Sequence, residues 1–265
     1  MVELNFWGTP NLNHIFECWQ CFRWNEQADE SYIGVANGEV VRAYVDGDKV
    51  ILDGTDDVEF WTHYFDCGFD YEGAKERFAQ DGILKKCIDY GFGIRILRQD
   101  LFETIISFII SANNNIPRIK GIIERLCGEN CAFPTAESIV DMGLEKLSTI
   151  GAGYRDKYIY KTAKVILNGD VDLDEIVKLP TSEARKELLK LHGVGPKVAD
   201  CILLFGMSRF DVFPSDVWIK RILNDTYNCP PNKICEFAEE KFGEYRGLAQ
   251  QYLFYYFRDN LKNIS

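Results

Sequence analysis

An amine and a carboxylate stand at two predicted helix starts in the C-terminal half of the sequence. Lys197 follows the run Gly193-Val194-Gly195-Pro196, in which a two-glycine turn ends one helix and Pro196 suits the first position of the next. Asp216 follows an extended segment and is a residue type that caps a helix. The helix dipole and partial burial both disfavour an ammonium at Lys197, so we expect a lowered pKa and use of this amine as a nucleophile.

These two groups can reach one another. A helix over 196–205 is about 15 Å long, and the segment 206–215 can span about 30 Å, so Asp216 can return beside Lys197. The two glycines also let backbone amides approach an anion at the positive end of the new helix, where a DNA phosphate fits. This pattern favours a helix-hairpin-helix DNA clamp; an ordinary helix-turn-helix corner and a surface lysine near a phosphate are the alternatives.

The composition limits the class of protein. The 265 residues suit one to two domains, and 46% hydrophobic residues provide for a packed core. No stretch reaches the roughly 18 apolar residues of a membrane span, and Met1 to Asn11 lacks signal-peptide features, so we expect an intracellular protein with no membrane partner. The net charge of −11 argues against broad non-specific nucleic-acid binding. Any DNA binding must therefore rest on local geometry.

The cysteines and histidines do not suggest a metal or disulfide framework. An odd number of cysteines in a reducing compartment predicts free thiols, and three widely spaced histidines give little support for zinc. Cys18 and Cys21 form a lone C-x-x-C, for which redox or metal chemistry is the less favoured interpretation. The nine cysteines are at positions 18, 21, 67, 87, 127, 131, 201, 229 and 235.

The elements that must position these residues form an α+β pattern. Asn37-Gly38 and Asp46-Gly47 favour tight hairpin turns between strands, and Cys21 to Trp24 is expected to form the first edge of the same sheet. Asp100 can cap a buried, central helix that ends at Ser111. We therefore expect an antiparallel sheet domain with flanking helices over 1–95 and an all-helical domain over 96–265. The predicted strands cover 32–36, 39–45 and 49–52, and the other predicted helices cover 117–126, 136–140, 156–167, 182–191, 196–205, 217–224, 233–241 and 247–261.

Five segments in this order resemble the 8-oxoguanine DNA glycosylase/AP lyase family of the helix-hairpin-helix superfamily. Two are the hairpin with Lys197 and the later Pro214-Ser215-Asp216. The other three are Gln20 to Trp24, Ser107 to Ile116 and Gly247 to Phe254. The hairpin is widespread, even among non-enzymes, but the full set is specific. Beyond the hairpin region only Cys229 and Cys235 follow, so the four-cysteine loop of the iron–sulfur glycosylases is missing.

The resemblance implies a bifunctional enzyme, a DNA N-glycosylase that is also an AP lyase. Lys197 matches the lysine that attacks C1′ of the damaged nucleoside, expels the base and forms a Schiff base, after which β-elimination nicks the strand. Asp216 matches the carboxylate that stabilises the cationic sugar and assists proton movement. The implied substrate is double-stranded DNA that carries 8-oxoguanine opposite cytosine.

The resemblance also assigns the base pocket. Phe254 and Cys201 match the residues on the two faces of the flipped base, and Gln250 matches the residue that reads its Watson–Crick edge. Trp19 stands where the family commonly has a glycine whose carbonyl accepts the N7–H of 8-oxoguanine. Without the resemblance, Phe254 would be interpreted as core packing and Cys201 as an ordinary buried thiol.

Contacts to the opposite strand are implied by a second group of residues. Asn113 matches the residue that fills the space left by the flipped base, and Tyr154 matches the wedge beside it. Arg118 and Arg155 match the arginines that read the orphaned cytosine, since forked donors suit its acceptor edge. The alternative is that the asparagines end a helix and the arginines are solvated. Trp218 stands where animal members carry a phosphate-binding histidine, so its indole N–H could donate only one bond.

Two other hypotheses remain open at this level. The Trp19 side chain can shift the pocket loop, so an oxidised pyrimidine or another purine is an alternative lesion. A non-catalytic DNA-binding helix-hairpin-helix module is the alternative from a different class of protein, and the pairing of Lys197 with Asp216 disfavours it. We expect a monomer that requires no cofactor, with a structural potassium, sodium or calcium ion possible at the Gly193 hairpin. The expected location is the cytoplasm, at the nucleoid in a prokaryote, or the nucleus in a eukaryote.

Overall fold

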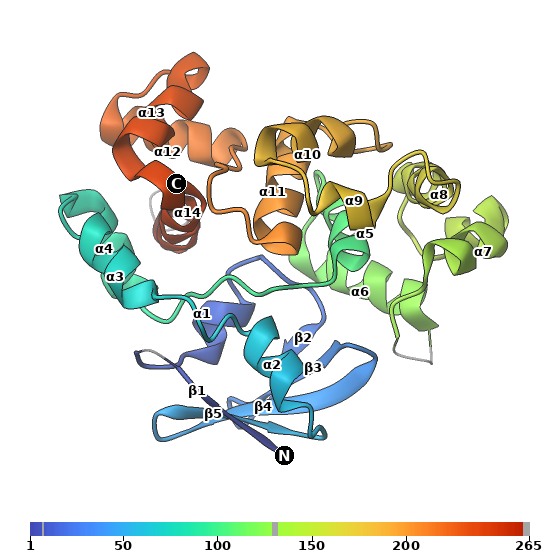
Figure 1. Cartoon of the computed structure of the whole chain (residues 1–265), viewed down its shortest axis with the longest axis horizontal. Helices are drawn as coiled ribbons and strands as arrows, with labels where there is room; N and C mark the ends of the chain where they lie inside the picture. The colour runs from blue at the N-terminus through green and yellow to red at the C-terminus, as the bar shows by residue number, and fades with distance from the viewer. Residues whose placement is uncertain (7, 129–131, 262–265) are drawn as a thin grey trace.

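A five-stranded antiparallel sheet occupies one end of the chain in the computed structural model, which describes residues 1–6, 8–128 and 132–261 (Figure 1). The strand order is β1-β5-β4-β3-β2. Asn37 and Gly38 both have positive φ, as the predicted tight turn requires, and the turn pairs Ala36 with Glu39. The three predicted strands are confirmed, whereas β1 was not predicted. The strands are β1 (Val2–Asn5), β2 (Trp24–Glu26), β3 (Tyr32–Ala36), β4 (Glu39–Asp46) and β5 (Lys49–Asp53).

Aromatic side chains fill the space between the sheet and the helices α1 (Leu12–Phe16) and α2 (Val58–Tyr64). The Phe16 and Trp24 rings stack with centroids 4.1 Å apart. The Trp24 indole N–H donates to the Tyr64 hydroxyl at 2.9 Å, so its one polar group is satisfied inside the core. The sheet therefore presents a rigid support to the loop between α1 and β2.

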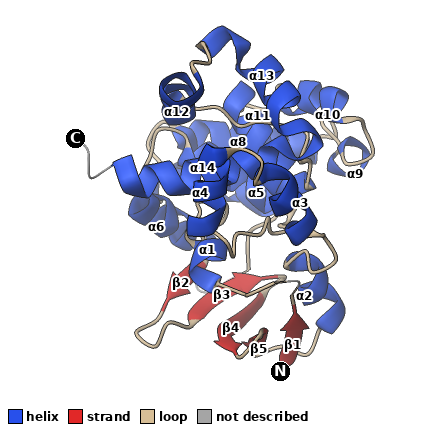
Figure 2. Cartoon of the chain, turned by 90° about the vertical axis from the view of Figure 1, so that its left-hand side faces the viewer, coloured by secondary structure: helices blue, strands red, loops and turns tan. Residues whose placement is uncertain are grey.

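Helices form the rest of the described chain, and Figure 2 shows them stacked above the sheet. The buried helix α5 (Leu101–Ser111) packs against α11, and the Asp100 carboxylate accepts the Glu103 amide at 2.7 Å as its predicted cap. Helix α7 is interrupted at Gly143, whose φ of +67° and ψ of 169° are not helical, so a first helical segment ends close to the predicted residue 140 and a second continues to Thr149. The predicted α+β architecture is confirmed. The remaining helices are α6 (Ile116–Cys127), α7 (Ala136–Thr149), α8 (Arg155–Leu167), α9 (Leu173–Ile176), α10 (Thr181–Leu188), α11 (Pro196–Met207), α12 (Val217–Tyr227), α13 (Ile234–Phe242) and α14 (Arg246–Leu261).

Two helices of the N-terminal third belong to the helical core. Helix α4 (Gly82–Tyr90) packs against α14 and against α3 (Tyr71–Phe78), and the buried side chains of Tyr71, Leu84 and Cys87 belong to the larger apolar cluster. The sheet has a separate apolar cluster of its own. A domain boundary between residues 95 and 96 stays a prediction. Helices α3 and α4 precede that boundary in sequence, but their buried side chains pack in the apolar cluster of the later helices.

The structure also places the cysteines. Seven of the cysteines among the described residues are free thiols, and all of these except Cys235 are buried: Cys18, Cys21, Cys67, Cys87, Cys201, Cys229 and Cys235. Cys131 lies outside the described residues. Within the described ranges no helix is long and apolar enough to cross a membrane.

Candidate active site

The hairpin between α10 and α11 has the backbone geometry that its two glycines allow. Gly193 has a φ of +82°, and a Cβ atom there would lie 2.9 Å from the Tyr158 ring of α8. Gly195 is the N-cap of α11, and a Cβ there would meet only open space. The Val194 amide donates to the Leu191 carbonyl at 3.3 Å, so its hydrogen bond closes the turn. Within the described chain the Gly193 and Gly195 amides have no backbone acceptor and can meet an anion.

Lys197 and Asp216 line one cavity of about 610 Å³. Lys197 is in the first turn of α11, half-buried, with its Nζ atom 5.7 Å from the centre of the Phe108 ring of α5. Asp216 is the N-cap of α12, and its Oδ1 atom accepts the Ile219 amide at 2.9 Å. One carboxylate therefore starts a helix and also faces the cavity that holds the amine.

The electrostatics of Lys197 differ from the sequence-based expectation. Cys201, one helical turn further along α11, raises the pKa of Lys197, and Asp216 acts in the same direction, while burial opposes them. Burial raises the pKa of the Cys201 thiol as well. The expectation of a lowered lysine pKa was therefore wrong, because it considered the dipole and burial but not these neighbours. A raised pKa favours the ammonium form of Lys197 in the free protein.

Four residues predicted to contact the base line the same cavity. Phe254 and Gln250 come from α14, Cys201 from α11 and Trp19 from the loop after α1. Gln250 is 4% exposed, and its amide has no hydrogen-bond partner in the described chain, which leaves it available to a ligand. Helices that are distant in sequence thus bring an aromatic ring, a thiol and an amide to one place.

Trp19 adopts a backbone conformation that favours glycine. Its φ is +69°, and its ring meets Phe254 edge-on with centroids 5.8 Å apart. The Trp19 indole therefore forms part of the cavity wall.

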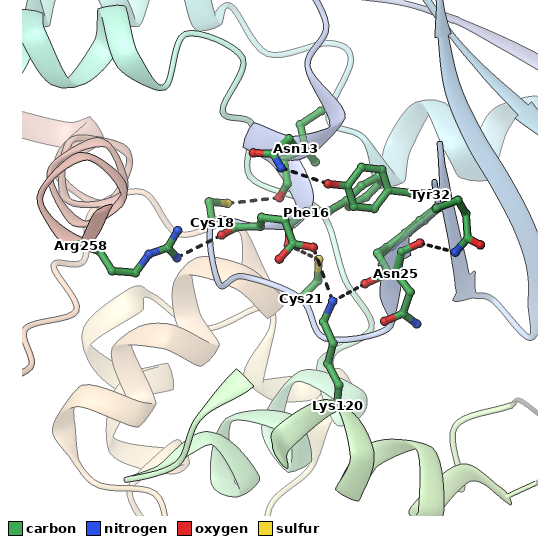
Figure 3. Close-up of polar contacts among 12 residues, drawn as sticks. Asn13, Phe16, Cys18, Cys21, Asn25, Tyr32, Lys120 and Arg258 are labelled. Carbon is green, nitrogen blue, oxygen red and sulfur yellow. Dashed lines mark hydrogen bonds and ion pairs between the residues drawn. The ribbon is translucent and has the colours of Figure 1, made fainter. Parts of the chain in front are cut away.

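The Trp19 loop is held by contacts that sequence reasoning missed, shown in Figure 3. Arg258 of α14 donates to the Glu17 carbonyl at 3.1 Å and lies 5.2 Å above the Trp19 ring. From α6, Lys120 donates to the Trp24 carbonyl at 2.6 Å and pairs with the Glu17 carboxylate at 3.5 Å. Gln251 also donates to the Cys18 carbonyl. Arg258 and Lys120 do not belong to any recognisable motif, so the sequence carries no sign that they hold this loop.

Of the predicted opposite-strand residues Asn113, Arg118, Tyr154 and Arg155, only Asn113 lines the cavity. Arg118 is exposed and donates to the Gly151 carbonyl at 3.2 Å. Arg155 is 3% exposed, and its guanidinium donates to three backbone carbonyls, those of Ala112, Asn113 and Ala152. Arg155 therefore anchors the Asn113 loop, and its reading of the orphaned cytosine stays a prediction.

Two of the predicted DNA contacts are exposed aromatic residues. Tyr154 precedes α8, is 55% exposed and has the Arg155 guanidinium 4.5 Å from its ring centre. Trp218, on the first turn of α12, lines the cavity and is 52% exposed. Among the described residues no group of three or more potential side-chain metal ligands occurs.

A phosphate-accessible hairpin, a cavity with a lysine and a carboxylate, and this helical arrangement define a helix-hairpin-helix DNA glycosylase. The family model "8-oxoguanine DNA glycosylase, N-terminal domain" matches residues 7–105, and "HhH-GPD superfamily base excision DNA repair protein" matches residues 106–245. The chain belongs to the 8-oxoguanine DNA glycosylase family of this superfamily and is a DNA N-glycosylase with AP lyase activity.

Individual relatives agree with this assignment. The structure of MBOgg1 in complex with a low-affinity DNA ligand is 44% identical, with a TM-score of 0.90, 95% of this chain covered and 93% of that one. The Clostridium acetobutylicum 8-oxoguanine glycosylase/lyase, bound to DNA with cytosine opposite 8-oxoguanine, is 42% identical, with the same TM-score and coverage. The probable N-glycosylase/DNA lyase of Methanothermobacter thermautotrophicus is 34% identical over 81% of this chain and 77% of its own length. DNA is the partner of this chain.

Proposed function

We propose that this protein excises 8-oxoguanine opposite cytosine from double-stranded DNA through a Schiff base on Lys197 and then nicks the strand. The observation that carries the proposal is the convergence of the Lys197 amine and the Asp216 carboxylate on the cavity that Phe254, Cys201 and Gln250 line. A DNA-binding module without catalysis does not need an amine in the lining of this cavity.

The covalent steps follow from these two groups. The neutral Lys197 amine forms a bond to C1′ while the N-glycosidic bond breaks and its electron pair leaves with the base, which takes up a proton. The sugar ring then opens to a Schiff base, loses a C2′ proton and expels the 3′ phosphate, which cuts the strand. Asp216 opposes the positive charge that develops on the sugar.

The base would be held by groups suited to its faces and edges. The Phe254 ring and the Cys201 sulfur lie on the cavity wall and can enclose a flat base. Gln250 has a free amide for the Watson–Crick edge, and the Trp19 carbonyl supplies an acceptor for the N7–H that guanine lacks. The indole of Trp19 narrows this cavity, which keeps a different oxidised base as the second candidate substrate.

The proposal is tested with duplexes that carry 8-oxoguanine opposite each of the four bases, incubated with borohydride. We expect the trapped adduct to form fastest opposite cytosine. Trapping on an oxidised pyrimidine or another purine, and none on 8-oxoguanine, would keep the chemistry and change the substrate. No trapping on any of these lesions would overturn the proposed activity.

The same duplexes test the reading of cytosine by Arg118. This side chain is exposed beside the Asn113 loop, whereas the Arg155 guanidinium is occupied by backbone carbonyls. We expect Arg118→Ala to reduce the preference for cytosine by about tenfold or more, the size of one lost bidentate base contact. Arg42→Ala, which removes an exposed arginine from β4, is the control and should keep the full preference. An unchanged preference in Arg118→Ala would assign the reading to another residue.

The raised pKa of Lys197 predicts an alkaline-rising activity. Only the neutral amine attacks C1′, and Cys201 and Asp216 favour the ammonium, so the neutral fraction increases about tenfold per pH unit below the pKa. We expect the single-turnover excision rate to rise in this way from pH 6 to pH 9. In Cys201→Ala the main cause of the raised pKa is gone, so the rise should move to lower pH. A flat profile in the wild type would contradict an ammonium ground state.

A structural cation at the hairpin also belongs to this proposal. The carbonyls of Leu191, His192 and Gly195 each accept one hydrogen bond and keep a second lone pair, so they can still hold potassium, sodium or calcium together with a DNA phosphate. Such an ion would position the phosphate and take no part in the covalent steps. We propose that the protein acts as a monomer where the DNA of the cell lies.

A further inference from the structure

Helix α8 carries an unusual local charge for this acidic protein. The chain as a whole has 30 basic and 41 acidic residues. Helix α8 has four basic residues, Arg155, Lys157, Lys161 and Lys164, and a single acidic residue, Asp156. Positive charge is thus concentrated on one helix of a chain whose excess charge is negative.

The lysines of α8 also differ from other exposed lysines in their partners. Lys178 and Lys186 pair with glutamates three residues away at 2.7 Å and 2.8 Å. Lys157, Lys161 and Lys164 are exposed, and none has an ion-pair partner among residues 1–6, 8–128 and 132–261. Their charges are therefore available to an external anion.

Helical spacing places two of these lysines on one face with two tyrosines. Tyr154, Lys157, Tyr158 and Lys161 follow the spacing of a single helix face, and all four are exposed. The Tyr154 and Tyr158 rings contact each other edge-on at 5.8 Å. We call these four residues the α8 face.

The α8 face lies between the two segments that approach DNA. On one side, the Tyr158 ring packs against Gly193 of the hairpin, and Thr162 donates to the His192 carbonyl at 2.9 Å. On the other side, Arg155 donates to the Asn113 carbonyl at 2.8 Å. A duplex that contacts the hairpin and the Asn113 loop together must pass close to the start of α8.

We propose that the α8 face is a further DNA-binding surface, on which Lys157 and Lys161 contact phosphates outside the flipped nucleotide. This inference rests on the proposed function for the position of the DNA. Lysine ammonium groups suit phosphates as point charges, and such contacts add affinity without sequence preference. They would compensate locally for the net charge of −11, which repels a polyanion.

The test is the salt dependence of binding to an undamaged duplex, measured by fluorescence anisotropy. Each phosphate contact contributes about 0.9 to the slope of log affinity against log salt. We expect Lys157→Gln/Lys161→Gln to lower the magnitude of this slope by about 2 and to weaken binding about tenfold at low salt. Circular dichroism verifies that the variant is folded.

The matched control removes the same charge elsewhere. Lys49→Gln/Lys85→Gln replaces two exposed lysines, on β5 and α4, that pair with Glu3 and Asp89. If the α8 face binds phosphates, this control keeps the wild-type slope. Equal slopes in the wild type and the α8 variant, or the same loss in the control, would overturn the proposal. Borohydride trapping by the wild type is measured in parallel, and its failure would refute the proposed function separately.

Discussion

Lys197→Gln forms no borohydride-trapped adduct and excises 8-oxoguanine at least about 10³-fold more slowly than the wild type, if the amine is the nucleophile. Glutamine is polar and one atom shorter than lysine, but its amide nitrogen cannot attack C1′. Trapping on a labelled duplex and single-turnover excision measure the two losses.

The control for this variant is Lys220→Gln. Lys220 is an exposed lysine on α12, close in sequence to Asp216, so its replacement removes the same charge near the site without removing the nucleophile. We expect this control to trap normally. Lys197→Gln should still bind a duplex, since the hairpin is intact. A Lys197→Gln protein that traps as well as the wild type would assign the Schiff base to another amine.

Asp216→Asn is expected to lose activity with little loss of stability. The Asp216 side chain caps α12 through the Ile219 amide, and asparagine caps a helix equally well. It carries no charge, however, and cannot stabilise the cationic sugar. We expect excision to fall about 10²- to 10³-fold, with a melting temperature within a few degrees of the wild type.

Asp216→Ala separates the two roles of this carboxylate. It loses the charge and also the helix cap, so it should be as inactive as Asp216→Asn and in addition less stable by about 1 kcal/mol. Chemical denaturation measures the difference between the two variants. Near wild-type excision by Asp216→Asn would show that the carboxylate only caps the helix.

The position of Asp216 explains why one residue can do both. An N-cap residue has extended backbone, and its side chain lies at the positive end of the helix. The first turn of α11 brings the Lys197 amine to the same cavity from a second helix start. Helix starts place side chains reproducibly, which suits groups that must meet a reacting atom.

Local sequence determined most of the elements of this protein. Asn37-Gly38 predicted a hairpin because few other residue pairs adopt positive φ at two adjacent positions. Asp100 predicted the start of α5 because its carboxylate accepts a hydrogen bond from an amide in the first turn of the helix. The hairpin at Gly193 and the two helix starts at Lys197 and Asp216 were predicted for the same reason: turns and caps depend on a few adjacent residues.

Tertiary structure alone decided what surrounds each of these groups. The pKa of Lys197 depends on Cys201 and Asp216. The Arg155 guanidinium donates hydrogen bonds to carbonyls of a loop that is distant in sequence. Arg258, far along the chain, contacts the loop in which Trp19 has a positive φ. Charges, carbonyls and rings interact through space, so their effects depend on distances that only the folded chain sets.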